Sequence, residues 1–181
     1  MSKFHYFIGI EVPEELREQF QSVQQALELS NYYRRVTHAQ DLHCTLSFIG
    51  DLEEEELQGL TEQLQLIKSP SFQLTTDSIA GFGEGKAPRV VYARVAPAQQ
   101  LIHLEEQVWS VTADFQADRK TPFIPHITLA KRAKPLEPIK FTGKLAVSWK
   151  IEAFHLYRVH KGKSPSYEKL TTFSLSQDGT Q

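Results

Sequence analysis

Two copies of one short motif carry the residues of this chain that could do chemistry. His43-Cys44-Thr45-Leu46 and His126-Ile127-Thr128-Leu129 both read histidine, apolar residue, threonine, leucine. Ordinary composition would produce such a matched pair in about one chain in a thousand, so the repetition is a signal. Two imidazoles, each with a hydroxyl two residues on, could supply the acid, the base and the hydrogen-bond donors that phosphodiester cleavage needs without a metal.

The two histidines suit complementary roles in such a reaction. The reference pKa of histidine is about 6.5, so one imidazole can act as a neutral base while the other acts as a protonated acid near neutral pH. Thr45 and Thr128 would donate hydrogen bonds to the phosphoryl oxygens and fix the orientation of the phosphate. Each proton transfer of this kind is typically worth roughly 10²–10⁴-fold in rate. The scheme needs neither a metal nor another cofactor.

Strand geometry predicts which of these side chains share a surface. The motifs lie in two apolar runs, Leu42 to Ile49 and Phe123 to Ala130, which suit β-strands. Alternate residues of a strand share a face, so His43 and Thr45 point one way while Cys44 points the other. The second motif alternates in the same way. We therefore expect the two polar faces to meet across a groove.

Other interpretations of the motif residues are weaker. A single histidine on a strand is commonly structural, but that argument loses force when two matched copies occur. Two histidines could also bind zinc, yet catalytic zinc usually has a third protein ligand, and neither motif has an acid or a histidine at i+3 or i+4. Cys44 could be named a nucleophile, but alternation sends its sulfur to the opposite face as a small buried hydrophobe. The other five histidines lack a matching threonine and are interpreted as surface or core residues.

The rest of the chain predicts the elements that must position the motifs. Apolar residues recur at helical spacing in three segments, which we expect to form helices over about 14–29, 53–64 and 97–115. Strands are expected over 4–12, 41–49, 72–82, 89–95, 124–131, 141–149, 151–160 and 167–175. Gly50-Asp51 should turn the chain after the first motif, and the glycine-rich stretch between Phe82 and Arg89 should form the mobile loop of a hairpin.

This order of elements indicates an α+β fold. At 181 residues the chain suits one domain, or two small lobes that share an interface. The two histidines are 83 positions apart, 126 minus 43, a little under half the chain. That spacing suggests two similar lobes, each of which supplies one motif.

Composition limits the partners and the compartment. The net charge of −2 provides no global attraction for nucleic acid, so a short RNA end or a small fragment fits better than a long duplex. The single cysteine excludes an intrachain disulfide, and the N-terminus lacks the apolar stretch of a signal peptide, so a cytoplasmic protein is expected. No apolar run approaches the length of a membrane span. Nothing demands more than a monomer.

The motifs and their surroundings resemble those of the two-histidine phosphoesterases. The resemblance is carried by Phe7-Ile8-Gly9-Ile10 before Pro13-Glu14, by Leu42 to Gly50, and by Phe123 to Lys131. Within these enzymes the chain is most similar to the bacterial and archaeal RNA 2′,3′-cyclic phosphodiesterases, historically called 2′-5′ RNA ligases. The match spans nearly the whole chain in order.

The resemblance implies an α+β fold in which residues 1–181 form one bilobal phosphodiesterase domain, with two pseudo-symmetric lobes of antiparallel sheet and helices around a central groove. It implies hydrolysis of a 2′,3′-cyclic phosphate at an RNA 3′ end to a 2′-phosphate, with reversible 2′-5′ ligation as a side activity. By family assignment, His43 would donate a proton to the departing 3′ oxygen and His126 would take one from water. Thr45, Thr128 and Lys131 would bind the substrate.

Three positions depart from the family pattern. A basic residue commonly follows the first motif, where this chain has Ser47. An arginine often ends the second motif, where it has Lys131, which keeps the charge for phosphate but loses the bidentate fork. Thr121 stands where an arginine often precedes the Phe-x-Pro-His segment. The candidates to compensate are Arg119, Lys120 and Arg132.

Other substrates and one other class of function are compatible with the same motifs. The chemistry would also suit a phosphodiesterase that acts on 2′-5′ oligoadenylate, ADP-ribose cyclic phosphate or small cyclic nucleotides. A noncatalytic module could use the groove to bind RNA ends, although a binder needs no matched acid and base. Phe7, Phe48 and Tyr167 could stack on a base, or they could belong to the core.

Overall fold

The computed structural model describes residues 4–84, 87–116, 121–134 and 141–176. The strands in these ranges are β1 (His5–Glu11), β2 (Tyr33–Val36), β3 (His43–Asp51), β4 (Phe72–Phe82), β5 (Val90–Val95), β6 (His126–Ala133), β7 (Gly143–Lys144), β8 (Ser148–Ile151), β9 (Ala153–Val159) and β10 (Tyr167–Ser174). The helices are α1 (Glu14–Ala26), α2 (Leu29–Tyr32), α3 (Glu54–Leu64) and α4 (Gln99–Thr112), with single 3₁₀ turns at η1 (Ala39–Asp41) and η2 (Ala113–Phe115). Among these helices none has the length and hydrophobicity that a membrane crossing requires.

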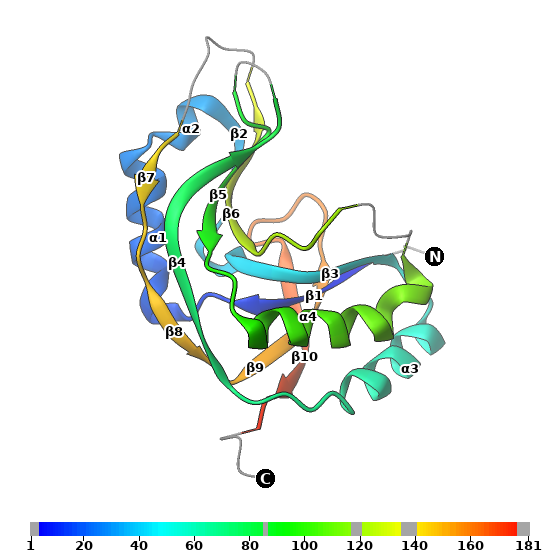
Figure 1. The fold of residues 1–181 in the computed structure, drawn as a ribbon. Helices are drawn as coiled ribbons and strands as arrows, with labels where there is room; N and C mark the ends of the chain where they lie inside the picture. Colours follow the sequence, from blue (N-terminus) through cyan, green and yellow to red (C-terminus); the bar gives the residue numbers. More distant parts are fainter. Residues whose placement is uncertain (1–3, 85–86, 117–120, 135–140, 177–181) are drawn as a thin grey trace.

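The strands form one antiparallel sheet that has two halves. Its order is β10-β9-β1-β3-β6-β5-β4-β7, with β2 beside β6 and β8 beside β4 (Figure 1). The motif strands β3 and β6 are neighbours at the middle of this order, but they pair only through Cys44 and Ile127. Each is paired much more extensively with its other neighbour, β1 or β5. The predicted α+β fold with two lobes of antiparallel sheet is therefore confirmed, and each lobe contributes one motif strand.

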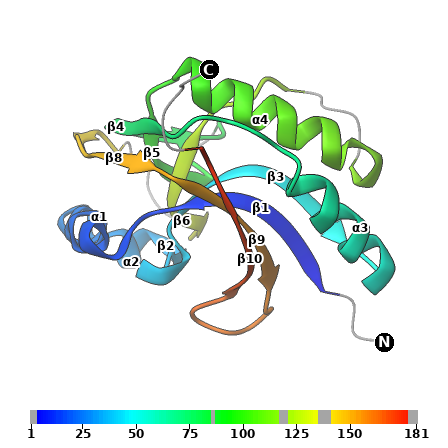
Figure 2. The same cartoon turned by 90° about the horizontal axis from the view of Figure 1, so that it is seen from below.

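Helices pack against both motif strands. Helix α4 packs on β3, and α1 packs on β6. Figure 2 shows α3 beside α4 over β3, while α1 and α2 lie together near β2. The predicted apolar stripe of α4 explains its position, because Leu101, Leu104 and Val108 are completely buried. Burial of these side chains in a core shared with β3 holds the first motif strand in place.

Most predicted elements are observed with shifts of a few residues at their ends, but the predicted turn at Gly50-Asp51 is wrong. Both residues belong to β3, where Gly50 pairs with Tyr6 and Asp51 with His5. Gly50 adopts a φ of +90°, which a glycine tolerates without a steric penalty. The ladder with β1 thus continues through a backbone conformation that would otherwise favour a turn.

The single strand predicted over 141–149 is also wrong, because the structure has two short strands, β7 and β8, on either side of a break. The hydroxyl of Thr76 explains the break: it donates to the carbonyl of Leu145 at 2.5 Å and accepts from the N–H of Val147 at 3.3 Å. These bonds replace the regular ladder with β4 between the two strands. The mobile loop predicted between Phe82 and Arg89 falls partly on residues 85–86, outside the described residues.

Candidate active site

Cys44 and Ile127 form a cross-strand pair that relates the two motifs by an approximate local twofold axis. Both residues are completely buried. In an antiparallel pair the flanking residues also face each other, so His43 lies toward Thr128, and Thr45 lies toward His126. Both strands begin with the same burial pattern, in which histidine and threonine are half-buried and the residue between them is buried. The structure thus brings the four predicted groups to one face, where the edges of the two lobes meet.

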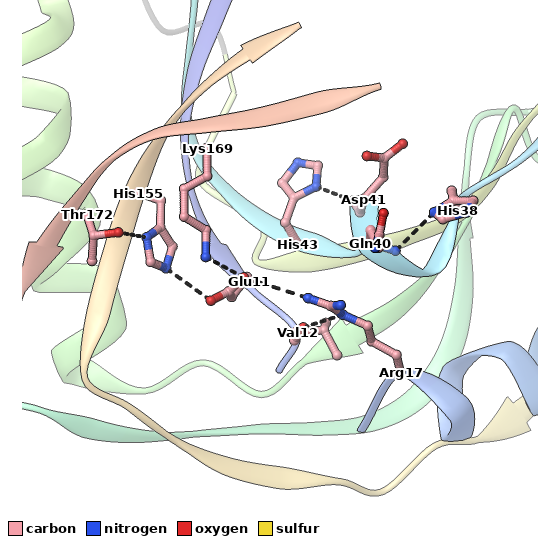
Figure 3. A network of polar contacts seen from close by, with 10 residues as sticks. All are labelled: Glu11, Val12, Arg17, His38, Gln40, Asp41, His43, His155, Lys169 and Thr172. Carbon is pink, nitrogen blue, oxygen red and sulfur yellow. Dashed lines mark hydrogen bonds and ion pairs between the residues drawn. The ribbon is translucent and has the colours of Figure 1, made fainter. Parts of the chain in front are cut away.

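Hydrogen bonds hold both imidazoles by the same ring nitrogen. The Nδ1–H of His43 donates to the carbonyl of Asp41 at 2.7 Å (Figure 3), and the Nδ1–H of His126 donates to the carbonyl of Ile124 at 2.8 Å. Because a carbonyl can only accept, the proton of each neutral ring lies on Nδ1. The Nε2 of His43 is 2.8 Å from the hydroxyl of Thr45, from which it can accept. In both rings Nε2 is therefore the nitrogen available for acid-base chemistry.

Aromatic rings fix the orientation of His43. Phe7 on β1 lies against the imidazole with a centroid distance of 4.6 Å, and the edge of Tyr167 on β10 approaches it at 5.2 Å. Phe7 is only 2% exposed and also stacks on Tyr157 at 4.8 Å. Phe7 is therefore a packing residue of the site rather than a free surface for a base.

His126 is packed in a comparable way by the other lobe. Phe82 on β4 and Tyr92 on β5 present their rings to the imidazole at 4.9 and 5.3 Å. The two aromatic rings also stack on each other at 4.1 Å. Each lobe thus holds its own histidine from neighbouring strands.

A β-bulge follows the first motif and changes which side chains reach the site. Pairing with β1 skips Leu46, because Gly9 pairs with Thr45 and Ile8 pairs with Ser47. A bulge of this kind reverses the alternation of faces. Ser47 is consequently buried, and its hydroxyl lies 2.8 Å from that of Thr112 on α4. The side chain at this departure from the family pattern therefore faces helix α4 and not the motif face.

An equivalent bulge follows the second motif. Pairing with β5 skips Leu129, since Tyr92 pairs with Thr128 and Val91 pairs with Ala130. Lys131 therefore returns to the side of the motif, as Phe48 does in the other lobe. Phe48 and Lys131 each stand five residues after the histidine of their motif, so they occupy equivalent positions.

A cavity of about 520 Å³ opens over this face, and four of the five predicted site residues line it: His43, Thr45, Thr128 and Lys131. His126 is not among the lining residues, although its strand neighbour Thr128 is. Phe7, Phe48 and Tyr167, which sequence reasoning left open as base-stacking or core residues, all line the cavity, although Phe7 is only 2% exposed.

Sequence reasoning missed Asp41 and Arg35, which also line the cavity. The buried carboxylate of Asp41 accepts the backbone N–H groups of Ser166 and Tyr167 at 2.8 and 3.1 Å. Arg35 donates to the hydroxyl of Ser166 at 2.6 Å. The position of Asp41 two residues before His43 was visible in the sequence, but its partners lie more than a hundred residues away.

Burial lowers the pKa of both motif histidines. The pKa of His43 falls to about 4, because desolvation of the ring outweighs its attraction to the backbone carbonyl and the carboxylate of Asp41. Desolvation likewise lowers the pKa of His126. Burial therefore favours the neutral form of both imidazoles in the free protein, so His43 needs a bound negative charge to act as the protonated partner. An anion bound about 4 Å away would favour the imidazolium by ~4 kcal/mol at an effective dielectric constant of about 20.

A second polar network lies beside the motif on β1, β9 and β10. Glu11 on β1 pairs with His43 on β3, and its carboxylate accepts a hydrogen bond from the ammonium group of Lys169 at 2.8 Å (Figure 3). His155 lies 3.5 Å from the same carboxylate, and its Nδ1 is 3.0 Å from the hydroxyl of Thr172. Desolvation lowers the pKa of His155 to about 4. This buried histidine joins the strands that support His43.

The structure tests only part of the proposed compensation for the missing arginine. Arg119 and Lys120 lie outside the described residues. Arg132 is exposed, has a left-handed φ of +62°, and does not line the cavity. Within the described ranges no three histidine, cysteine, aspartate or glutamate side chains gather closely enough to hold a metal ion.

Comparisons with known proteins agree with this architecture. A family model described as the 2′-5′ RNA ligase superfamily matches residues 12–163. The chain is 30% identical, over 97% of its length, to an RNA 2′,3′-cyclic phosphodiesterase of Geobacillus stearothermophilus, of which it spans 58%. It is 32% identical to the RNA 2′,3′-cyclic phosphodiesterase of Escherichia coli, with 94% of this chain and 96% of the relative covered.

Its fold matches a crystal structure of E. coli LigT complexed with 3′-AMP at a TM-score of 0.83 and 27% identity, covering 97% of this chain and 100% of that one. The order of strands, the paired motifs and the family match lead to one conclusion: the chain belongs to the 2′-5′ RNA ligase superfamily.

Proposed function

We propose that this protein hydrolyses a 2′,3′-cyclic phosphate at an RNA 3′ end to a 2′-phosphomonoester by acid-base catalysis that needs no metal. The observation that carries the proposal is the matched pair of imidazoles, each held through Nδ1 by a carbonyl two residues before it. This arrangement leaves both Nε2 atoms free of the backbone carbonyls, on the two strands that pair where the lobes meet. The superfamily relatives named RNA 2′,3′-cyclic phosphodiesterase support the same reaction.

The proton transfers follow from these positions. The Nε2 of His126 takes a proton from water as its oxygen attacks phosphorus, and the bond from phosphorus to the 3′ oxygen breaks. The protonated Nε2 of His43 donates its proton to that 3′ oxygen, and the phosphate stays on the 2′ oxygen. Thr45 and Thr128 donate to the nonbridging oxygens, and Lys131 offsets their charge. The same steps with a 5′ hydroxyl in place of water form a 2′-5′ phosphodiester and release the 3′ hydroxyl, which is ligation; attack by that 3′ hydroxyl with departure of the 5′ oxygen reverses it.

Asp41 supports this division of roles. Its carboxylate attracts a proton to His43, whereas desolvation and the bond to the carbonyl of Ile124 determine the pKa of His126. The attraction from Asp41 is smaller than the desolvation of His43. The negative charge of the substrate must therefore arrive before His43 holds a proton at pH 7.

The test is turnover of adenosine 2′,3′-cyclic phosphate by His43→Ala and His126→Ala. Both variants should lose hydrolysis while keeping the thermal unfolding transition of the parent protein. His103→Ala is the matched control, because His103 is an exposed histidine that does not line the cavity. Full activity in either motif variant would overturn the mechanism, and activity that is lost with a chelator and restored by zinc would replace it with metal catalysis.

The substrate, assembly and compartment belong to the same proposal. An RNA end is the proposed substrate, and product analysis across 2′,3′-cyclic nucleotides, 2′-5′ oligoadenylates, ADP-ribose cyclic phosphate and RNA ends distinguishes it from the alternatives. A monomer is proposed because one chain supplies both motifs and the cavity beside them. A cytoplasmic location is consistent with a single, buried and unpaired cysteine.

A further inference from the structure

The two ends of the groove are chemically different although the two motifs are alike. Strands β3 and β6 run antiparallel and meet at Cys44 and Ile127, so the residues that follow each motif lie on opposite sides of that point. Phe48 follows the first motif and Lys131 follows the second, and both line the cavity. The local twofold relation is therefore broken by an aromatic ring at one end and a cation at the other.

The cationic end contains a like-charged pair across two strands. Arg35 on β2 pairs directly with Lys131 on β6, so the two side chains share a face and start about 5 Å apart. Like charges in this relation are destabilising unless an anion lies between them. Burial lowers the pKa of Lys131, and the charges of Arg35 and Arg132 lower it further. Arg34 and Lys163 also line the cavity. The carboxylate of Asp41, which accepts hydrogen bonds from two backbone N–H groups, lines it too and partly offsets the positive charge at Lys131.

The aromatic end presents a ring to the cavity. Phe48 is 53% exposed, whereas its cross-strand partner Phe7 is 2% exposed. The other large apolar side chains that are exposed in the described part of the chain are Leu66, Ile102 and Ile124, and none of them lines this cavity. An exposed aromatic ring in a cavity suits stacking with a nucleobase, because every base offers a π face.

The order of substituents on a ribose matches the order of groups along the groove. A 2′,3′-cyclic phosphate occupies C2′ and C3′, the base is attached next to it at C1′, and the 5′ phosphate leaves from C4′ on the other side. With the cyclic phosphate at the motifs, the base and the 5′ phosphate must point to opposite ends. We propose that the groove binds the terminal nucleotide in one orientation, with its base on Phe48 and its preceding phosphodiester at Arg35, beyond the cyclic phosphate that Lys131 contacts.

This orientation rests on the proposed function, but it can be measured by equilibrium binding of stable products, independently of turnover. Three ligands separate the contributions: ribose 2-phosphate, adenosine 2′-phosphate, and an adenylyl dinucleotide with a terminal 2′-phosphate. Phe48→Ala should weaken adenosine 2′-phosphate by about 5- to 150-fold, the range expected for one stacked base, and leave ribose 2-phosphate unchanged. Phe48→Trp should retain the tight binding. Leu66→Ala, at an exposed apolar residue outside the cavity, is the matched control.

The cationic end is tested with Arg35→Met. The dinucleotide should lose about tenfold or more in affinity, as expected when a charge-assisted hydrogen bond is removed, while adenosine 2′-phosphate binds as before. Lys144→Met is the control for net charge, because Lys144 is exposed on β7 and lies outside the cavity. Equal losses for all three ligands in Phe48→Ala, or equal losses for both nucleotides in Arg35→Met, would overturn the orientation.

The same measurements keep this inference separate from the proposed function. The expected binding pattern without turnover of any cyclic phosphate would sink the function and leave the orientation standing. Turnover of the cyclic phosphate by the parent protein without the expected binding pattern would overturn the orientation and leave the proposed function standing. Failure of the parent protein to bind the dinucleotide more tightly than ribose 2-phosphate would also overturn the orientation.

Discussion

Acid should destabilise this protein through His43, and the size of the effect follows from its burial. The pKa of His43 is about 4 in the folded chain, against 6.5 as its ordinary value. Below the ordinary value the unfolded chain binds a proton that the folded chain does not bind. Stability contributed by neutral His43 is therefore complete above about pH 6.5 and is lost as the pH falls toward 4.

The difference between these pKa values sets an upper limit. A difference of 2.5 between the ordinary and the folded value corresponds to ~3 kcal/mol at about 1.4 kcal/mol for each pH unit. The ring is half-buried and its Nε2 side borders the cavity, so water there reduces the cost of charging it. For a chain of this size, ~3 kcal/mol corresponds to a fall of roughly 6–12 °C in melting temperature.

The assay is urea unfolding at about pH 7.5 and about pH 4.5, in the parent protein and in His43→Asn. The amide of asparagine can replace Nδ1 as the donor to the carbonyl of Asp41, so the variant keeps the backbone contact but cannot take up a proton. Other buried histidines titrate in both proteins and cancel in the comparison. We expect the parent to lose up to ~3 kcal/mol more than the variant between the two pH values. An equal loss in both proteins would refute the assignment of a strongly lowered pKa to His43.

Three further predictions concern residues around the motif. Gly9→Ala should lower kcat for adenosine 2′,3′-cyclic phosphate, because the added Cβ would lie 3.1 Å from the carbonyl oxygen of Cys44 and 3.3 Å from the ring of His43. Gly59→Ala is the control and should leave kcat unchanged, because a Cβ at Gly59 would meet open space. Asp41→Asn should lower the free energy of unfolding by ~1–3 kcal/mol, because an amide cannot accept from the N–H groups of both Ser166 and Tyr167 as a carboxylate does. Denaturant titration measures this loss, and an unchanged unfolding midpoint would contradict it. Lys131→Met should raise the KM for the cyclic nucleotide by about tenfold, whereas Lys131→Arg, which keeps the charge, should not. If steady-state kinetics give the same KM for Lys131→Met and the parent protein, Lys131 does not bind the substrate.

Local patterns were sufficient for most of the elements. The stripe of α4 and the alternation of the two motif strands each depend on neighbours in sequence, and both are seen in the structure. Strand β2 was missed because four residues are too few for a periodic signal. It exists through its pairing with β6, almost a hundred positions later, and it carries Arg35 into the cavity.

The sequence by itself determined the chemical groups of this protein: two histidines and two threonines, placed on one face of their strands by alternation, with Cys44 on the other. The tertiary structure alone decided what lies around them. The bulges at Leu46 and Leu129 depend on pairing with β1 and β5, and they turn Ser47 away and bring Phe48 and Lys131 to the groove. The pKa of His43 depends on burial by side chains from distant strands. Register and desolvation are set by long-range contacts, and for that reason no local pattern in the chain could reveal them.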